Sequence, residues 1–267
     1  MFSLKKSKIL FFLFALAIPA YSQVNYKPPK LSAGQLKGID FKKAKPVDES
    51  YRDEFAKCDR TPRCRRDKNN LKALLKFPDG TIFFDSKMGL DLDGSWKACS
   101  CGEKGKTDQC RTTHLWNPPH PTTTEYNRQE DKCVFYKEQA FVDAENIPYM
   151  VIPSGEKFNR LTGLKAGDFG IVIYRDKMIP VFVADTGPDF RIGEGSAALL
   201  RAVGVDRCKA RNEERHCTDY EDSSIEENVL FFIFPNSKSK DLKKENALAV
   251  IKEKALKRFE EFKKSLE

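Results

Sequence analysis

The middle of the chain is a series of short hydrophobic runs, each bounded by Gly, Pro, Asp or Asn. Apolar runs of this length, with such boundaries, are typical of β-strands. The runs lie at 81–84, 147–153, 169–174, 179–184 and 229–234. Residues 175–177 join the third and fourth runs at hairpin length, so these two strands are expected to pair directly.

One segment, 193–204, has a helical pattern instead, with Ser196 suited to the N-cap and Gly204 to the C-cap. The strands are spaced too closely for repeated β-α-β units. Residues 51–236 provide enough chain for one domain with a sizeable core. We therefore expect a mainly β (α+β) domain, built as a small closed β-barrel with long loops and one internal helix.

The segments on either side of this domain differ from it. Residues 23–50 combine Pro and Lys without periodicity, which indicates a linker or an extended N-terminal arm. Residues 237–267 predict an amphipathic helix that packs on the barrel or on a partner rather than in a membrane. Its apolar stripe consists of Leu248, Ile251, Ala255, Phe259, Phe262 and Leu266.

The first 22 residues have the pattern of a secretory signal. Lys5, Lys6 and Lys8 precede a short apolar run, and Ala20 and Ser22 are small residues at the positions that a signal peptidase inspects. The run is short for a membrane span, and no stop-transfer segment follows. We expect cleavage before Gln23 and a secreted or periplasmic protein; an uncleaved anchor is the alternative.

All cysteines follow the signal: Cys58, Cys64, Cys99, Cys101, Cys110, Cys133, Cys208 and Cys217. An even number in an exported chain indicates a disulfide framework, here stapling the loops. Cys58–Cys64 and Cys208–Cys217 are the preferred pairs, because each closes a short polar loop. The pairing of the other four stays open.

A zinc site is the weaker alternative for these cysteines. It would use Cys99, Cys101 and Cys110 with His114 or His120. However, Cys-x-Cys lacks the two-residue gap that is usual in a structural zinc knuckle. We therefore expect no metal and no other cofactor.

Charge limits the class of partner. The whole chain carries a formal +8, and three of its lysines lie in the signal, which leaves +5 on the mature protein. The basic C-terminal run mixes signs at helical spacing, so it reads as a solvated helix and not as a nucleic-acid patch. We expect a monomer that binds neither nucleic acid nor, after signal cleavage, a membrane. A basic exported protein is weakly attracted to anionic cell walls.

The longest loop, about 96–138, contains Trp116 in a stretch rich in Thr and Pro. Loops of this length are usually functional or stapled. In a sugar-binding protein, Trp116 would stack on a pyranose ring. Capping of a small satellite core is an equally good interpretation of the same residue.

Asp185 and Glu194 are the strongest candidates for chemistry. They lie nine residues apart in 183–196, and a straight strand would separate them by roughly 30 Å. The sequence Thr-Gly-Pro-Asp at 186–189 is typical of a turn, so the chain should fold back between them. The glycines on either side of Glu194 allow a tight bend that leaves this side chain open to a ligand. The pair can then approach the roughly 6.5–9.5 Å that an inverting glycosidase requires.

A second acidic cluster, at 83–94, contains Asp85 and the pair Asp91 and Asp93. Asp-x-Asp-Gly resembles the opening of a calcium loop, but the Glu that such a loop requires later is missing. On a strand, the two aspartates would point to the same face. Like charges side by side are costly unless they face water or a cation, including a cationic ligand.

A family resemblance connects these segments. MGLDLDG (88–94), 147–153, 167–204 and 228–235 resemble, in order and spacing, the chitosanases of glycoside hydrolase family 75. The resemblance covers about 80–235, and the family's two essential carboxylates map onto Asp185 and Glu194. It implies a secreted enzyme that hydrolyses β-1,4-linked glucosamine polymers with inversion.

Two features depart from the family pattern and bear on substrate range. The family usually has Asn-Gly after the Asp-led turn, where this chain has Gly187-Pro188, and the cysteine-rich loop exceeds a minimal family domain. The segment 183–196 is also similar to the Asp-Thr-Gly segment of double-psi β-barrel domains that lyse cell walls. That second similarity implies a double-psi-like barrel.

The resemblance implies single displacement by two carboxyl groups. We assign Glu194 as the acid, because the intrinsic pKa of Glu is the higher, and Asp185 as the base. Asp91, Asp93 and Asp189 would hold the ammonium groups of chitosan. The alternatives are a lytic enzyme acting on deacetylated peptidoglycan and a non-catalytic wall-binding module of the same fold.

Overall fold

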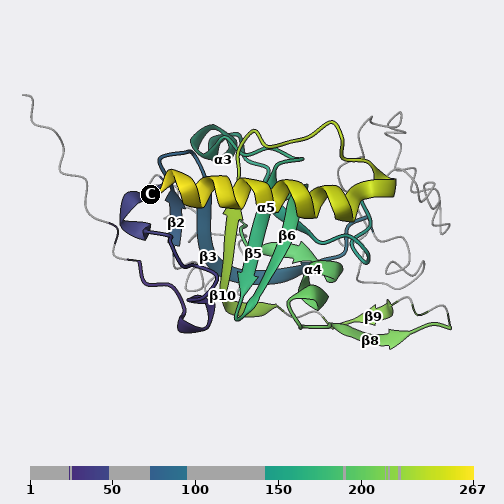
Figure 1. The fold of residues 1–267 in the computed structure, drawn as a ribbon. Helices are drawn as coiled ribbons and strands as arrows, with labels where there is room; N and C mark the ends of the chain where they lie inside the picture. The colour runs from purple at the N-terminus through teal and green to yellow at the C-terminus, as the bar shows by residue number, and fades with distance from the viewer. Residues whose placement is uncertain are drawn as a thin grey trace, which may run out of the picture.

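The computed structural model describes residues 24, 26–47, 73–94, 142–188, 191–213, 215, 217–221 and 224–267. Within these ranges the chain forms one eight-stranded sheet, a separate two-stranded sheet and three α-helices (Figure 1). The predictions for the signal, for the loop at 96–138 and for six of the cysteines lie outside the described residues.

Six strands close into a barrel, which confirms the predicted architecture. They pair in the order β3 (Ile82–Asp91), β10 (Ile225–Ile233), β5 (Phe169–Tyr174), β6 (Lys177–Gly187), β4 (Tyr149–Pro153) and β7 (Glu194–Ser196). β7 then pairs with β3 and closes the ring. Two short strands, β1 (Lys45–Pro46) and β2 (Ala73–Lys76), extend the sheet beside β3.

The strands carry apolar side chains on both faces. Phe231 and Phe232, neighbours on β10, belong to two different hydrophobic clusters, since successive side chains of a strand point to opposite faces. The cluster of Phe232 includes residues of the C-terminal helix, which crosses the outside of the strands (Figure 1). The cluster of Phe231 therefore fills the barrel interior.

The predicted strands are all present, and several are longer than their apolar runs. β5 has the predicted bounds, whereas β3 and β6 continue into polar residues because their ladder partners continue. The segment at 194–196, predicted as the start of a helix, is strand β7 instead. The pairing of Glu194 with Gly89 and Val151 determines this, and no local pattern reveals it.

The internal helix begins after β7. α4 spans Ala197–Ala202, and the Ser196 hydroxyl accepts a hydrogen bond from the Leu199 N–H, which confirms Ser196 as the N-cap. Gly204 follows with a φ of +93°, the left-handed conformation that ends helices. A second internal helix, α3 (Glu156–Thr162), was not predicted; it is seven residues long and buries Phe158.

The N-terminal arm packs on the barrel. It contains two 3-10 turns, η1 (Lys30–Ser32) and η2 (Phe41–Lys43). The rings of Phe41 and Tyr26 lie 4.9 and 5.2 Å from that of Phe83. The arm thus covers the outer face of the sheet and is part of the body of the protein.

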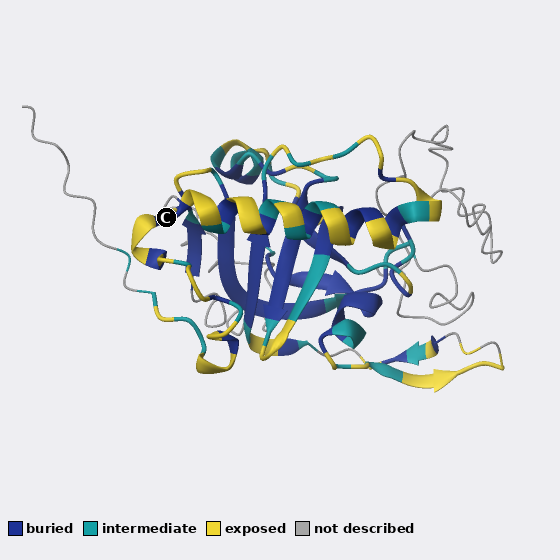
Figure 2. Ribbon diagram, in the orientation of Figure 1, coloured by how far each residue is buried: buried dark blue, intermediate teal, exposed yellow. Residues whose placement is uncertain are grey.

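The C-terminal helix α5 (Ala247–Ser265) follows a 3-10 turn, η3 (Lys244–Asn246). Its buried side faces the strands and its exposed side faces outward (Figure 2). Five residues of the predicted stripe are buried, but Leu248 is 57% exposed, so its assignment to the stripe was wrong. Ala247 and Val250 occupy that part of the buried face, because contact with the barrel begins at Ala247. No helix among the described residues is long and apolar enough to cross a membrane.

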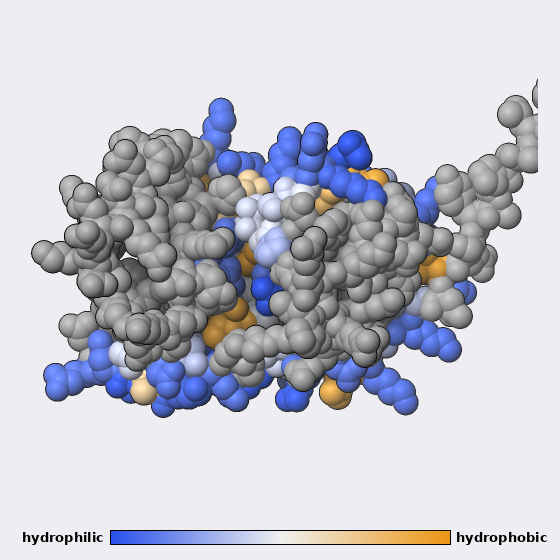
Figure 3. Space-filling model, turned by 180° about the vertical axis from the view of Figure 1, so that it is seen from behind, coloured by the Kyte–Doolittle hydropathy of each residue, from blue (hydrophilic) through white to orange (hydrophobic). Residues whose placement is uncertain are grey.

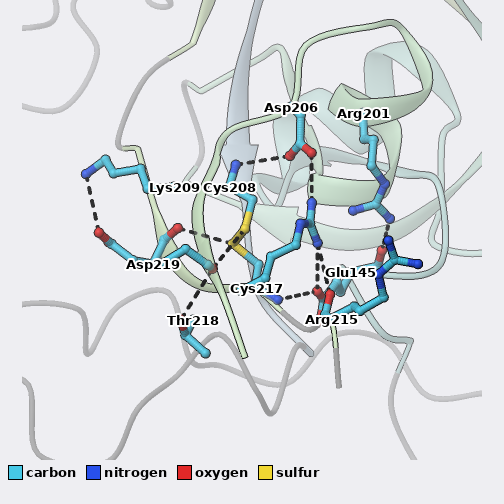
Figure 4. The surroundings of a disulfide bond; sticks show 11 residues. Glu145, Arg201, Asp206, Cys208, Lys209, Arg215, Cys217, Thr218 and Asp219 are labelled. Carbon is cyan, nitrogen blue, oxygen red and sulfur yellow. Dashed lines mark hydrogen bonds and ion pairs between the residues drawn. A yellow bond between two sulfur atoms is a disulfide. The ribbon is translucent and has the colours of Figure 1, made fainter. Parts of the chain in front are cut away.

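A hairpin of β8 (Cys208–Arg211) and β9 (Cys217–Tyr220) projects from the barrel (Figure 1). The predicted Cys208–Cys217 disulfide joins its strands, and the Cys217 N–H donates to the buried Glu145 carboxylate at 2.7 Å (Figure 4). Cys217 and Tyr220 also pack with Leu92 and Ala197. The hairpin is therefore fixed beside the ends of β3 and β7.

Candidate functional site

The two candidate carboxylates lie on either side of β4. Val151 of β4 is the register partner of Asp185 on β6 and of Glu194 on β7. Paired residues of neighbouring strands project from the same face, and two strand spacings put their α-carbons about 9–10 Å apart. The predicted return of the chain between the two acids is confirmed.

A β-bulge sets the direction of Asp185. Met150 pairs with Val183, but the next residue, Val151, pairs with Asp185, so Ala184 is an extra residue on β6. A bulge of this kind re-aims the side chains that follow it. Without the extra residue, Asp185 would point to the opposite face of the sheet.

The second acidic cluster joins the same site. One carboxylate oxygen from each of Asp91, Asp93 and Asp185 lies within 4.8 Å of the other two. Asp91 is the last residue of β3. Asp93 lies in the turn beyond it, whereas the sequence had suggested that both aspartates lie on the strand. The Asp93 N–H donates to Asp91 Oδ1 at 2.9 Å, so the turn brings the two side chains together.

Burial favours the protonated forms of two of these acids. Asp91 is 7% exposed and Asp185 9%. Loss of hydration is the main cause that raises the pKa of Asp91 to about 7, and the Asp93 charge adds to it. Loss of hydration, followed by the Asp91 charge, likewise raises the pKa of Asp185 to about 8. The pair therefore retains a proton at neutral pH.

Tyr149 contacts this cluster, and the sequence did not indicate it. Its hydroxyl donates to the Asp93 carbonyl at 2.9 Å, and its ring is fully buried. Burial and the Asp91 charge raise the pKa of the phenol well above its ordinary value, so Tyr149 is a neutral donor. Its position within an apolar strand, with no polar neighbours in sequence, gave no signal of this role.

Glu194 has a different environment from Asp185. The Arg191 side chain forms an ion pair with Glu194 at 3.0 Å between Nε and Oε1. A Cβ atom on Gly187 would lie 3.1 Å from Glu194 Oε2, so the glycine leaves space for the carboxylate. The ionised form of Glu194 is thus stabilised, while Asp185 retains a proton, which is opposite to the order expected from intrinsic pKa values.

Gly193 fixes the backbone before Glu194. Its φ is +81°, and a Cβ atom there would lie 2.1 Å from the Lys87 carbonyl oxygen. The Gly193 carbonyl accepts a hydrogen bond from the Gly89 N–H at 2.8 Å. The close approach of β3 therefore requires glycine at this position.

The close carboxylates can be stabilised by a proton or by a hard cation. Calcium takes about six to eight oxygen ligands. Hydrogen bonds reach Asp91 Oδ1 and the Asp93 carbonyl, and the other carboxylate oxygens of the three aspartates are available to either a proton or a cation.

Two predicted substrate-binding residues, Trp116 and Asp189, lie outside the described residues. On the side opposite α5, the described surface is mostly hydrophilic and includes small hydrophobic areas (Figure 3). No protein-family model and no curated protein matches this chain.

Proposed function

We propose that this protein is an exported glycosidase that hydrolyses β-1,4-linked amino-sugar polymers such as chitosan, with inversion. The observation that carries the proposal is the placement of Asp185 and Glu194 on one face of the sheet, on either side of β4. Inverting enzymes separate their carboxyl groups by roughly 6.5–9.5 Å, a spacing compatible with α-carbons about 9–10 Å apart.

The environments of the two groups support distinct roles. Asp185, which retains a proton, is the acid that donates to the leaving glycosidic oxygen. Glu194, paired with Arg191, is the base that takes a proton from water as this water attacks the anomeric carbon from the opposite face. The C–O bond breaks with its electron pair on the leaving oxygen, and proton exchange with solvent restores both carboxyl groups.

The substrate-binding roles are revised in one respect. Asp91 is less available to an ammonium group of the polymer, because its Oδ1 accepts the Asp93 N–H and its Oδ2 is buried. Asp93 is half-buried and remains the better candidate for that contact. The signal-like N-terminus and the Cys208–Cys217 disulfide support export, because disulfides persist in oxidising compartments.

The proposal is tested by incubating the mature protein with chitosan and with acetylated and deacetylated peptidoglycan. Product size and the anomeric configuration of the new reducing ends are then measured by NMR. We expect chitosan oligomers with inverted configuration. Cleavage of peptidoglycan alone would support the lytic alternative, and binding without cleavage of any polymer would support the wall-binding module.

The site assignment is tested with Asp185→Asn and Glu194→Gln. Each should lower kcat about 10²–10⁴-fold, because each removes one proton-transfer group. Asp176→Asn, in the exposed turn between β5 and β6, is the matched control and should retain full activity. Full activity in both site variants would show that the assignment is wrong.

A further inference from the structure

Asp91 takes no part in the mechanism above, yet it is the most buried acid of the site. Its side chain is 7% exposed, and its two oxygens differ in environment. Oδ1 accepts the Asp93 N–H, whereas Oδ2 is buried and has no hydrogen-bond donor among the described residues. A buried carboxylate oxygen without a donor is costly, so a partner for Oδ2 is required.

Among the described residues, two groups near Asp91 can act as donors. Asp93 in the turn, Tyr149 on β4 and Asp185 on β6 lie around Asp91, and Glu194 on β7 lies near Asp185. The Tyr149 hydroxyl also interacts with the Asp91 side chain, but its single proton is directed to the Asp93 carbonyl at 2.9 Å. The other group, the Asp185 carboxyl, can act as a donor to Asp91 when it carries a proton, and one of its oxygens lies within 4.8 Å of an Asp91 oxygen.

We propose that Asp91 is a positioning residue whose Oδ2 accepts a hydrogen bond from the protonated Asp185 carboxyl, and so keeps the acid of the reaction protonated. The negative charge of Asp91 opposes ionisation of Asp185. The hydrogen bond also fixes the orientation of the Asp185 carboxyl group about its Cβ–Cγ bond. This inference rests on the proposed function for its catalytic consequence but not for the hydrogen bond itself.

The proton is accounted for at each step. In the free enzyme it lies on Asp185, directed to Asp91 Oδ2. When the glycosidic bond breaks, the proton passes to the leaving oxygen, and both aspartates are briefly anions in a poorly hydrated site. Their mutual repulsion then favours uptake of one proton from solvent, which reloads Asp185.

Asp91→Asn tests the proposal, because the amide keeps the shape of the side chain and removes its charge. At pH 7 we expect kcat to fall about 2- to 90-fold with little change in KM, because the protonated fraction of Asp185 falls by this factor. The limb of the pH–kcat profile on which activity is lost at high pH should move down by about one to three units, since Asp185 loses its proton more easily. At low pH, where Asp185 is protonated in both proteins, the kcat of Asp91→Asn should therefore approach that of the wild type. Asp91→Glu, which restores the charge, should move this limb back toward the wild-type position.

Asp79→Asn is the matched control, because Asp79 lies in the turn before β3, away from the site, and should leave the profile unchanged. A pH–kcat profile of Asp91→Asn that coincides with that of the wild type would overturn the proposal. So would a uniform loss of kcat at every pH, because this is the effect of a merely structural residue.

A second measurement separates this inference from the proposed function. The ¹³C-labelled aspartate carboxyl signals are titrated by NMR, and the Asp185 signal is assigned with Asp185→Asn. In wild type we expect it to titrate near or above neutral pH, and in Asp91→Asn at lower pH, whether or not any polymer is cleaved. If Asp91→Asn does not fold, a wild-type Asp185 signal that titrates below pH 5 overturns the proposal and one that titrates near neutrality supports it. Stabilisation of wild type, but not of Asp91→Asn, by millimolar Ca²⁺ or Mn²⁺ would also overturn it, in favour of a cation.

Discussion

At the scale of single residues, Asp91 and Asp185 are acids whose pKa values are higher in the folded state than in the unfolded chain. Burial raises both pKa values, from 3.8 to about 7 and about 8. A native pKa above that of the unfolded chain stabilises the fold at low pH, and this contribution is lost as the pH rises through the native value. The site therefore lowers the stability of the protein at alkaline pH.

The first prediction follows from the direction of these two pKa shifts. Between about pH 5 and pH 8.5, the free energy of unfolding of the wild type should fall by on the order of 2–4 kcal/mol more than that of Asp185→Asn. Urea unfolding at several pH values measures the difference. Asp176→Asn, an exposed acid, should follow the wild type; an equal pH dependence in wild type and Asp185→Asn would contradict the prediction.

The second prediction concerns Gly193. Gly193→Ala places a Cβ atom 2.1 Å from the Lys87 carbonyl and forces a positive φ on alanine, so we expect a loss of about 2–4 kcal/mol in stability. Gly34→Ala is the matched control, since nothing lies within 4 Å of its Cβ position. Thermal unfolding of the two variants checks this, and equal melting temperatures would show that β3 can move away from the site.

The residues of the site were predictable to different degrees. Asp185 and Glu194 stand out because turn residues and glycines lie between and around them. The sequence also indicates the acidic cluster that contains Asp91, but the proximity of Asp91 to Asp185 depends on the bulge at Ala184. Tyr149 gave no signal, because a buried tyrosine in an apolar strand looks like a core residue whether or not its hydroxyl contacts a site.

At the scale of elements, the local sequence pattern predicts the strands that have long apolar runs. It does not predict β7, whose conformation depends on pairing with distant strands. β7 is three residues long, and its glycine and serine precede a good helix, so the segment reads as helical. Its strand conformation arises from pairing with β3 and β4 on either side. These partners are distant in sequence, and periodicity does not detect such contacts.

The third prediction concerns α5. Phe259 is 1% exposed and its ring lies 5.4 Å from that of Phe232 on β10. Phe259→Ala should therefore cost about 3–5 kcal/mol in stability. Leu248→Ala, on the exposed side of the same helix, should change stability by less than about 0.5 kcal/mol. Chemical denaturation of both variants makes the comparison; similar losses would mean that α5 is not docked as described.

At the scale of the whole molecule, the site exists only because the barrel closes. Asp91, Glu194 and Asp185 lie on β3, β7 and β6, which meet when β7 pairs with both β3 and β4. The arm and α5 cover the outer face of the sheet and contribute no residue to the cluster. The net charge is also a property of the whole molecule: it is +8 for the full chain and would be +5 after the proposed removal of residues 1–22, and it would act on a charged polymer before any contact forms.

The last prediction uses this charge to distinguish the two proposed substrates. Between about 10 and 100 mM salt the screening length falls from about 30 to about 10 Å. A cationic protein repels cationic chitosan, so the rate at low chitosan concentration should rise over this range, whereas the rate on an anionic wall polymer should fall. Lys252→Glu/Lys257→Glu on the exposed side of α5 lowers the net charge by four and leaves the site untouched, so it should flatten either trend. If the acids of the site alone governed encounter, the rate on chitosan would fall with salt instead, and the double variant would behave like the wild type.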